Sequence, residues 1–193
     1  MSSLPTGVLL AAGSSQRFGS NKLLHPIEKD ISMLMTTAAK LAAVLPGSIV
    51  VISQNLSSYR QQLEQLDLRV VINDRTDQGI GTSIACGVAA SKGALGWLIA
   101  LADMPFIKTE TLNSLAEKLC ETDGIIAPVV THANGELLRG HPVGFSRRYK
   151  QELLKLDEDI GARNVISRHQ DDLLLMPTDD HGVVKDIDRL SDL

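Results

Sequence analysis

The alternation of short apolar runs with segments of helical period constrains the fold of this chain more than any other feature. Runs rich in β-forming residues are separated by stretches whose apolar residues recur every three or four positions; the runs cover 7–11, 48–53, 69–72 and 96–101. Strands that are apolar along their whole length need cover on both faces, as in a parallel sheet. We therefore predict an α/β fold, a three-layer sandwich around a mostly parallel, Rossmann-like mixed sheet.

The second half of the chain is less regular. Apolar runs at 124–129 and 141–146 lie on either side of an Asn-Gly pair at 134–135, which is typical of a tight hairpin turn. This pair predicts at least one antiparallel strand. Helical periodicity returns at 147–156 and 162–169.

Composition restricts the classes of function. The chain has 193 residues and a formal net charge of -4, whereas sequence-independent nucleic-acid binders carry a basic excess. Polar residues interrupt each apolar stretch before it could span a bilayer, so we expect a cytoplasmic protein with no nucleic-acid and no membrane partner. Cys86 and Cys120 lack metal-like spacing and are expected to be reduced thiols in or near the core. Without a linker, residues 1–193 are expected to form a single domain.

The loop after the first apolar run has the composition of a phosphate-binding loop. Gly13 allows a tight turn with inward-pointing N–H groups, and Arg17 and Lys22 add two cations. The loop follows the carboxyl end of a predicted strand, where open α/β sheets bind ligands. Its glycine spacing matches neither a Walker A loop nor a dinucleotide fingerprint. Phosphate binding is one interpretation, and an ordinary loop with two solvated cations is the other.

The stretch "LLAAGSSQRFGSNKLL" closely resembles the signature loop of nucleotidyltransferases that share the nucleoside-diphospho-sugar transferase fold. Within that group the chain resembles the molybdenum cofactor nucleotidyltransferases, and its Ala-Ala-Gly resembles their cytidylyltransferase branch. The resemblance implies that the loop wraps a triphosphate, that Arg17 contacts the leaving pyrophosphate and that Lys22 meets the α-phosphate. The nucleotide contacts that it implies in this region are Leu10, Ala11, Ala12, Gly13, Ser14, Arg17 and Lys22.

Two acidic segments resemble the metal-binding segments of the same family. Asp103, in "LADMP", follows the apolar run 96–101 and could by itself be a turn or cap residue. Beside a triphosphate it would suit Mg²⁺, which binds one or two carboxylates together with phosphate oxygens. Asp186 and Asp188 lie on a strand-like stretch, 183–193, that could equally be a solvated acidic tail. The resemblance implies that Asp103 and Asp188 hold Mg²⁺. It leaves open whether the second ligand is Asp188 or Asp186.

A glycine-rich polar loop, "NDRTDQGIGTSIACGV" at 73–88, leads into a predicted helix. Small residues at a helix start can contact a base or ribose, although a simple turn with a Thr or Ser cap explains them nearly as well. In the resembling enzymes the matching stretch lines the nucleobase and ribose pocket. The resemblance therefore implies nucleotide contacts at Gly81 and Ser83, with Asp74 a weaker candidate.

Two later segments, "RGHPVGFS" and "DEDIGARNVI", also resemble the cytidylyltransferase branch. The resemblance implies that they shape the acceptor side of the site. A phosphate monoester is already anionic at neutral pH and needs no general base, so His141 and Arg163 are interpreted as residues that position the acceptor.

The expected function is nucleotidyl transfer with Lys22, Arg17 and Asp103 as catalytic residues and Mg²⁺ as cofactor. Expected partners are an NTP, with CTP favoured, and a phosphate-bearing acceptor such as molybdopterin, with transient contact to molybdenum enzymes or their maturation factors. The alternatives are a sugar or polyol phosphate as acceptor, a nucleotide-binding regulatory module, and a dinucleotide-dependent oxidoreductase, against which the missing G-x-G-x-x-G argues. The sequence leaves the base, the acceptor and the oligomeric state open.

Overall fold

The computed structural model of the chain describes residues 4–13, 21–28, 30–157, 159–189 and 192. One sheet holds most of the strands: β1 (Thr6–Ala11), β4 (Ile49–Ile52), β5 (Arg69–Ile72), β6 (Gly96–Leu101), β7 (Ile125–Thr131), β8 (Leu137–Arg139), β9 (Val143–Ser146) and β10 (Leu173–Pro177). Two short strands, β2 (Pro26–Glu28) and β3 (Ile31–Ser32), pair separately. The helices are α1 (Met33–Val44), α2 (Arg60–Glu64), α3 (Ile80–Ala90), α4 (Thr109–Cys120), α5 (Lys150–Leu153) and α6 (Arg163–Arg168).

The main sheet is mixed and mostly parallel, as predicted. Its strands follow the order β10-β7-β9-β6-β1-β4-β5, and β8 pairs with β7. β1 is parallel to β4 and β6, and β4 is parallel to β5. β9 runs antiparallel to both β6 and β7, so its amino end lies at the edge where β6 ends. The segment that precedes β9 thereby reaches the same edge as the loops after β1 and β6.

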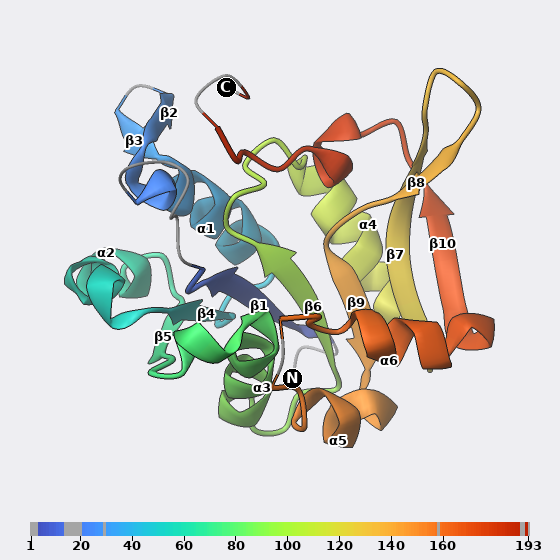
Figure 1. Cartoon of the computed structure of the whole chain (residues 1–193), viewed down its shortest axis with the longest axis horizontal. Coiled ribbons are helices and arrows are strands. Elements are labelled where there is room, and N and C mark those ends of the chain that lie inside the picture. The colour runs from blue at the N-terminus through green and yellow to red at the C-terminus, as the bar shows by residue number, and fades with distance from the viewer. Residues whose placement is uncertain (1–3, 14–20, 29, 158, 190–191, 193) are drawn as a thin grey trace.

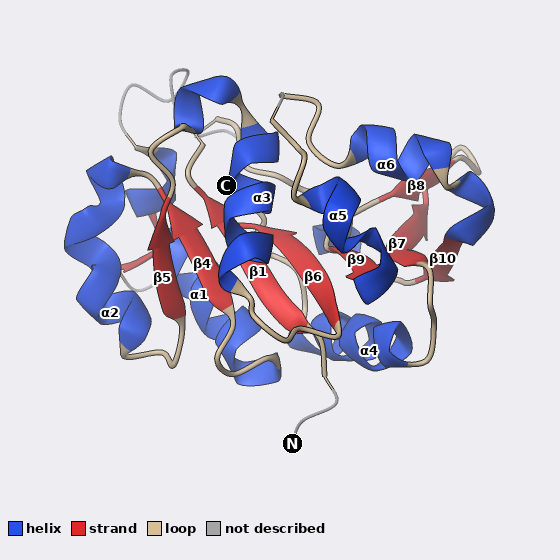
Figure 2. Ribbon diagram, turned by 90° about the horizontal axis from the view of Figure 1, so that it is seen from below, coloured by secondary structure: helices blue, strands red, loops and turns tan. Residues whose placement is uncertain are grey.

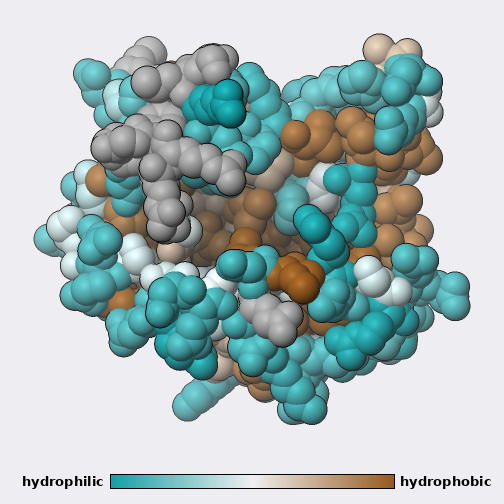
Figure 3. Space-filling model, viewed as in Figure 1, coloured by the Kyte–Doolittle hydropathy of each residue, from teal (hydrophilic) through white to brown (hydrophobic). Residues whose placement is uncertain are grey.

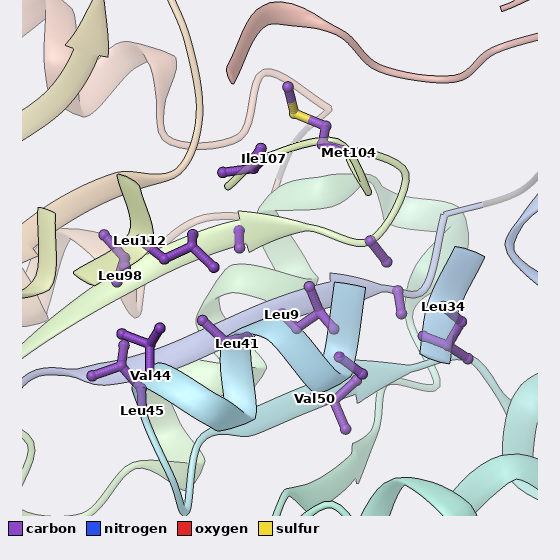
Figure 4. Close-up of a cluster of buried hydrophobic side chains, with 14 of the residues drawn as sticks. Leu9, Leu34, Leu41, Val44, Leu45, Val50, Leu98, Met104, Ile107 and Leu112 are labelled. Atoms are coloured by element: carbon purple, nitrogen blue, oxygen red, sulfur yellow. The ribbon is translucent and has the colours of Figure 1, made fainter. Parts of the chain in front are cut away.

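Helices cover both faces of the sheet, which makes the predicted three layers (Figures 1 and 2). α1 and α4 pack on one face, where Figure 4 shows Leu41 and Leu112 beside the sheet residues Leu9 and Leu98. α3, α5 and α6 pack on the other face around Trp97. Because both faces are buried, the central strands are apolar at nearly every position, with β4 buried throughout.

Several elements differ from the sequence-based expectation. β10 was not predicted, because an edge strand with exposed Leu174 and Leu175 has no alternating pattern. The stretch 183–193 is not a strand in its described part: a 3-10 helix spans His181–Val184, started by the Asp180 side chain, which accepts a hydrogen bond from the Gly182 N–H.

The two cysteines have different environments. Cys86 is half-buried in α3, as expected of a near-core thiol. Cys120 is exposed at the end of α4, so its expected placement near the core was wrong; the helix presents Leu112, Leu115 and Leu119 to the sheet instead. Burial raises the pKa of both thiols. In the part of the chain that the structure describes, no helix is long and apolar enough to cross a membrane.

Candidate active site

Three segments meet at the carboxyl edge of β1 and β6. Lys22 follows β1 and starts a 3-10 turn, where the Asn21 side chain accepts a hydrogen bond from the Leu23 N–H. Asp103 follows β6, and the β6 loop is fixed to β1 by a hydrogen bond from the Ala102 N–H to the Leu10 carbonyl. The C-terminal segment, drawn in red in Figure 1, crosses over this loop and brings in Asp188.

Lys22 forms ion pairs with both predicted metal ligands. Its Nζ lies 2.8 Å from Oδ2 of Asp103 and 2.8 Å from Oδ1 of Asp188. Burial alone would lower the pKa of Lys22, but the hydrogen bonds to the two carboxylates outweigh burial and raise the pKa above its ordinary value. The lysine is therefore charged at neutral pH, and both carboxylates point at one cation.

This donor set fits a hydrated divalent ion. In the described part of the chain, no group of three or more His, Cys, Asp and Glu side chains is arranged to hold a metal. Mg²⁺ does not need one, because it commonly takes one or two carboxylates and fills its other positions with water and phosphate oxygens. Asp103 and Asp188, which already converge on one positive charge, match that requirement.

The C-terminal segment is anchored to the rest of the fold by buried contacts that precede Asp188. Asp180 is 3% exposed, and its Oδ2 accepts hydrogen bonds from the Lys108 N–H at 2.8 Å and the Thr111 hydroxyl at 2.7 Å. Farther along, the Ile187 N–H donates to the Asp103 carbonyl at 3.0 Å, and the Ile187 side chain is fully buried. Asp186 and Asp188 therefore flank a buried residue, and of these two it is Asp188 that contacts Lys22.

A cavity of about 230 Å³ opens beside the Lys22 ion pairs. The predicted site residues that line it are Leu10, Ala12, Gly13, Lys22, Ser83 and Asp103. Ala11 is buried in the core, Gly81 is buried within α3, and Asp74 is exposed outside the cavity lining. Ser14 and Arg17 lie outside the described residues.

The cavity is also lined by residues that were not among the predicted nucleotide contacts: Thr76, Gly79 and Ile80 from the glycine-rich loop and the start of α3, and Asp159 from a segment expected on the acceptor side. The Asn73 amide donates hydrogen bonds to the hydroxyls of Thr82 and Ser83, which fixes the start of α3 against the end of β5. Gly79 has a φ of +101°, and a Cβ there would lie 2.7 Å from the Cα of Asp159. The sequence shows a glycine before the predicted helix start, but it does not show that Gly79 contacts a residue 80 positions away.

A second cavity, of about 360 Å³, adjoins the first. Leu10, Ile80, Leu101 and Asp159 line both cavities. His141, Arg139 and Arg163 line the second one, so the structure brings the two predicted acceptor residues together. The rest of the lining is mainly apolar, with Ile84, Ile99, Val143, Phe145 and Ile166 among its members. In the space-filling view, the face of the molecule in front of β1 and β6 is hollowed and has an apolar floor (Figure 3).

His141 is held as a neutral side chain. Burial lowers its pKa, and Arg139 and Arg163 lower it further, against the opposite effect of Asp103 and Asp186. Its Nδ1 is buried without a hydrogen-bond partner among the described residues. A neutral imidazole with an unpaired ring nitrogen suits hydrogen bonding better than charge-based capture of a phosphate.

Known proteins resemble this chain over nearly its whole length. The purine catabolism protein PucB of Bacillus subtilis (strain 168) is 28% identical over 192 residues, which cover 94% of this chain and 90% of PucB. The nicotine blue oxidoreductase of Paenarthrobacter nicotinovorans is 24% identical over 193 residues, covering 97% of this chain and 94% of that protein.

Solved structures also resemble this chain over nearly its whole length. The crystal structure of Rv0371c from Mycobacterium tuberculosis H37Rv has a TM-score of 0.77 at 29% identity and covers 97% of this chain and 95% of that chain. Rv0371c has also been solved in complex with manganese; that structure has a TM-score of 0.74 at 28% identity and covers 97% of this chain and 94% of that one. The sequence profile of the MobA-like NTP transferase domain matches residues 7–173, and the chain therefore belongs to the MobA-like NTP transferase family.

Proposed function

We propose that this protein is a Mg²⁺-dependent nucleotidyltransferase that transfers NMP from an NTP, with CTP favoured, to the terminal phosphate of molybdopterin, releasing pyrophosphate. The observation that carries the proposal is the convergence of Lys22, Asp103 and Asp188 at the mouth of a cavity whose wall includes Gly13 and Ser83. A cation and two carboxylates at the carboxyl edge of a parallel sheet suit a triphosphate with its metal.

Catalysis in this proposal is positioning and charge neutralisation. An acceptor phosphate oxygen attacks the α-phosphorus in line, the bond from that phosphorus to the bridging oxygen breaks, and pyrophosphate leaves with the electron pair. Lys22 stabilises the charge that builds on the α-phosphate, and Arg17 holds the leaving group. Asp103 and Asp188 would hold Mg²⁺, which supplies further neutralisation of phosphate charge when bound.

The second cavity favours an acceptor with a flat ring system, whose faces can pack on apolar side chains, over a sugar or polyol phosphate. A polyol needs hydrogen-bond partners for each hydroxyl group, whereas Val143, Phe145 and Ile166 offer none from their side chains. The polar groups gather on one side instead, where His141 and Arg163 could hold a ring heteroatom and an anionic group. A molybdopterin-type acceptor fits this division of the cavity.

The manganese complex of Rv0371c supports a divalent metal for this chain as well. The similarity to the nicotine blue oxidoreductase supports a second candidate function, that of an oxidoreductase with the same fold. The two candidates differ in what they need: the transferase requires two phosphorylated substrates and a metal, and the oxidoreductase requires an electron donor or acceptor.

The test is a pyrophosphate-release assay with Mg²⁺ in which CTP, GTP, ATP and UTP are offered in turn, with and without molybdopterin. We expect acceptor-dependent release that is fastest with CTP. If release depends on a sugar or polyol phosphate offered in place of molybdopterin, molybdopterin is not the acceptor. NTP binding without release under any condition would favour the regulatory module, and turnover of a reduced dinucleotide without release would favour the oxidoreductase.

A further inference from the structure

The carboxylates proposed to hold the metal are already occupied by a side chain of the same protein. Both hydrogen bonds from Lys22 Nζ, to Asp103 and to Asp188, are 2.8 Å long. The Lys22 side chain is 15% exposed and that of Asp103 is 23% exposed, so water screens their attraction only in part. The two carboxylates that would coordinate a divalent ion are the ones that accept hydrogen bonds from the ammonium group, each through one oxygen.

One pair of carboxylates cannot neutralise both cations fully. A divalent ion beside the ammonium group would be repelled by it at short range, and it would have to share acceptors that each ion needs. The arrangement is therefore a competition between a built-in monovalent cation and an incoming divalent one. A triphosphate changes that balance, because it offers Lys22 a new anionic partner in the adjoining cavity.

We propose that Lys22 is an internal competitor of the metal: in the nucleotide-free protein it occupies Asp103 and Asp188, and it moves to the triphosphate when a metal–nucleotide complex binds. The transfer of Lys22 rests on the proposed function, whereas the competition itself concerns the free protein alone. The exchange makes metal and nucleotide bind with positive coupling, since each removes an obstacle to the other. It also gives the free protein a weak metal site.

Of the two ion pairs of Lys22, the one with Asp188 is expected to break first. Asp188 is 51% exposed, more than twice the value for Asp103, and it lies beyond the buried anchor Ile187. Asp103 directly follows β6 and its loop is bonded to β1, so it offers a fixed ligand. Lys22 needs only to change its side-chain direction to leave both acids, because its Nζ is at the end of four rotatable bonds.

The competition is tested by titrating the nucleotide-free protein with Mn²⁺ and measuring free Mn²⁺ by electron paramagnetic resonance. Lys22→Met removes the charge, and we expect it to bind Mn²⁺ about threefold to tenfold more tightly than the wild type. Lys22→Arg keeps the charge and should bind like the wild type. Lys22→Gln, which is neutral but can still donate hydrogen bonds to the carboxylates, covers the case in which Lys22→Met fails to fold.

Lys40→Met is the matched control. Lys40 is a neighbouring cation that donates hydrogen bonds to the carbonyls of Pro105 and Ile107 in the loop after β6, and to neither carboxylate. Its loss should leave the Mn²⁺ affinity at the wild-type value. Equal or weaker Mn²⁺ binding by the neutral Lys22 variants overturns the competition, and so does the absence of detectable binding by every variant.

A second titration separates the competition from the proposed function. A non-hydrolysable CTP analogue should tighten Mn²⁺ binding to the wild type by a larger factor than to Lys22→Met, because only the wild type must move its lysine. If the free-protein result holds and the analogue has no effect, the competition stands and the transfer of Lys22 to a triphosphate fails. If the wild type releases pyrophosphate but the neutral variants bind Mn²⁺ no more tightly, the proposed function stands and the competition fails.

Discussion

At the scale of single residues, Lys22 has two different partners in this account. Its ammonium group pairs with carboxylates in the free protein and is proposed to meet the α-phosphate during transfer. We expect Lys22→Ala to lower kcat by about 10² or more, as for other preorganised charge stabilisers, while NTP affinity changes less. Steady-state kinetics together with NTP binding measured by calorimetry separates the two effects. Weaker NTP affinity at unchanged turnover contradicts this role.

His141 should link folding to pH. Its pKa is lowered in the folded state by burial, so the unfolded chain takes up this proton at a higher pH than the folded one. The stability that comes from neutral His141 is therefore complete above about pH 6.5 and is lost as the pH falls toward the folded-state pKa. Urea unfolding at pH 7.5 and 5.5 should show a smaller loss of stability in His141→Gln than in the wild type. Equal losses in both proteins argue against a buried neutral histidine.

At the scale of structural elements, the C-terminal segment holds a ligand through contacts far from that ligand. Asp180 connects this segment to the start of α4, where it accepts hydrogen bonds from Lys108 and Thr111. Asp180→Asn should lower the free energy of unfolding by about 1–2 kcal/mol, because the carboxylate caps the helix and makes charge-assisted bonds. It should also weaken Mn²⁺ binding in the presence of a nucleotide. Asp179→Asn, at the exposed neighbour, is the control, and equal Mn²⁺ affinity in both variants would show that Asp180 does not position Asp188.

The wall between the two cavities depends on a glycine. At Gly79, φ is +101° and a Cβ would lie 2.5 Å from the backbone N of Asp159, so Gly79→Ala must displace the segment around 159. Gly93→Ala is a matched control, since its φ is +82° and nothing lies within 4 Å of the added carbon. We expect both variants to lose about 1–2 kcal/mol of stability from backbone strain, and only Gly79→Ala to weaken nucleotide binding. Equal nucleotide affinity in the two variants contradicts a nucleotide site next to Asp159.

The elements that the sequence predicts well are those with a strong local pattern. β6 lies at 96–101 as predicted, since buried strands are continuously apolar, and the Asn-Gly turn at 134–135 connects the antiparallel β7 and β8. β2 and β3 are too short to show a period. The spacing of Ile31 from Leu34 and Met35 fits the apolar face of one helix, but Ile31 is 50% exposed in β3, because α1 begins only after its N-cap residue Ser32.

At the scale of the whole molecule, one sheet edge collects the parts of the site. The loops after β1 and β6 reach it because these strands are parallel, and the segment before β9 reaches it because β9 is antiparallel. The net charge of -4 gives no general attraction for a triphosphate, so the proposed triphosphate binding would rest on local groups such as Lys22. The family resemblance of their motifs implied that Lys22 and Asp103 belong to one site, and they lie together because β1 and β6, which they follow, are neighbouring parallel strands.

The rest of the site arises from tertiary contacts that no local pattern contains. Asp159 lines the first cavity and lies against Gly79, and the apolar floor of the second cavity comes from β6, β9, α3 and α6 together. The ion pairs of Lys22 with Asp103 and Asp188 join residues up to 166 positions apart. Sequence motifs identified these three residues, but only the fold shows that the lysine pairs with both predicted metal ligands.

The most direct measurement is a crystal structure of the protein with Mn²⁺ and a non-hydrolysable CTP analogue, with the metal located by its anomalous scattering. We predict one Mn²⁺ bound by Asp103 and Asp188, with Lys22 moved to the α-phosphate and the base against the start of α3 near Ser83. A metal bound elsewhere, or a lysine still paired with both aspartates while the triphosphate is bound, would contradict the proposed transferase centre.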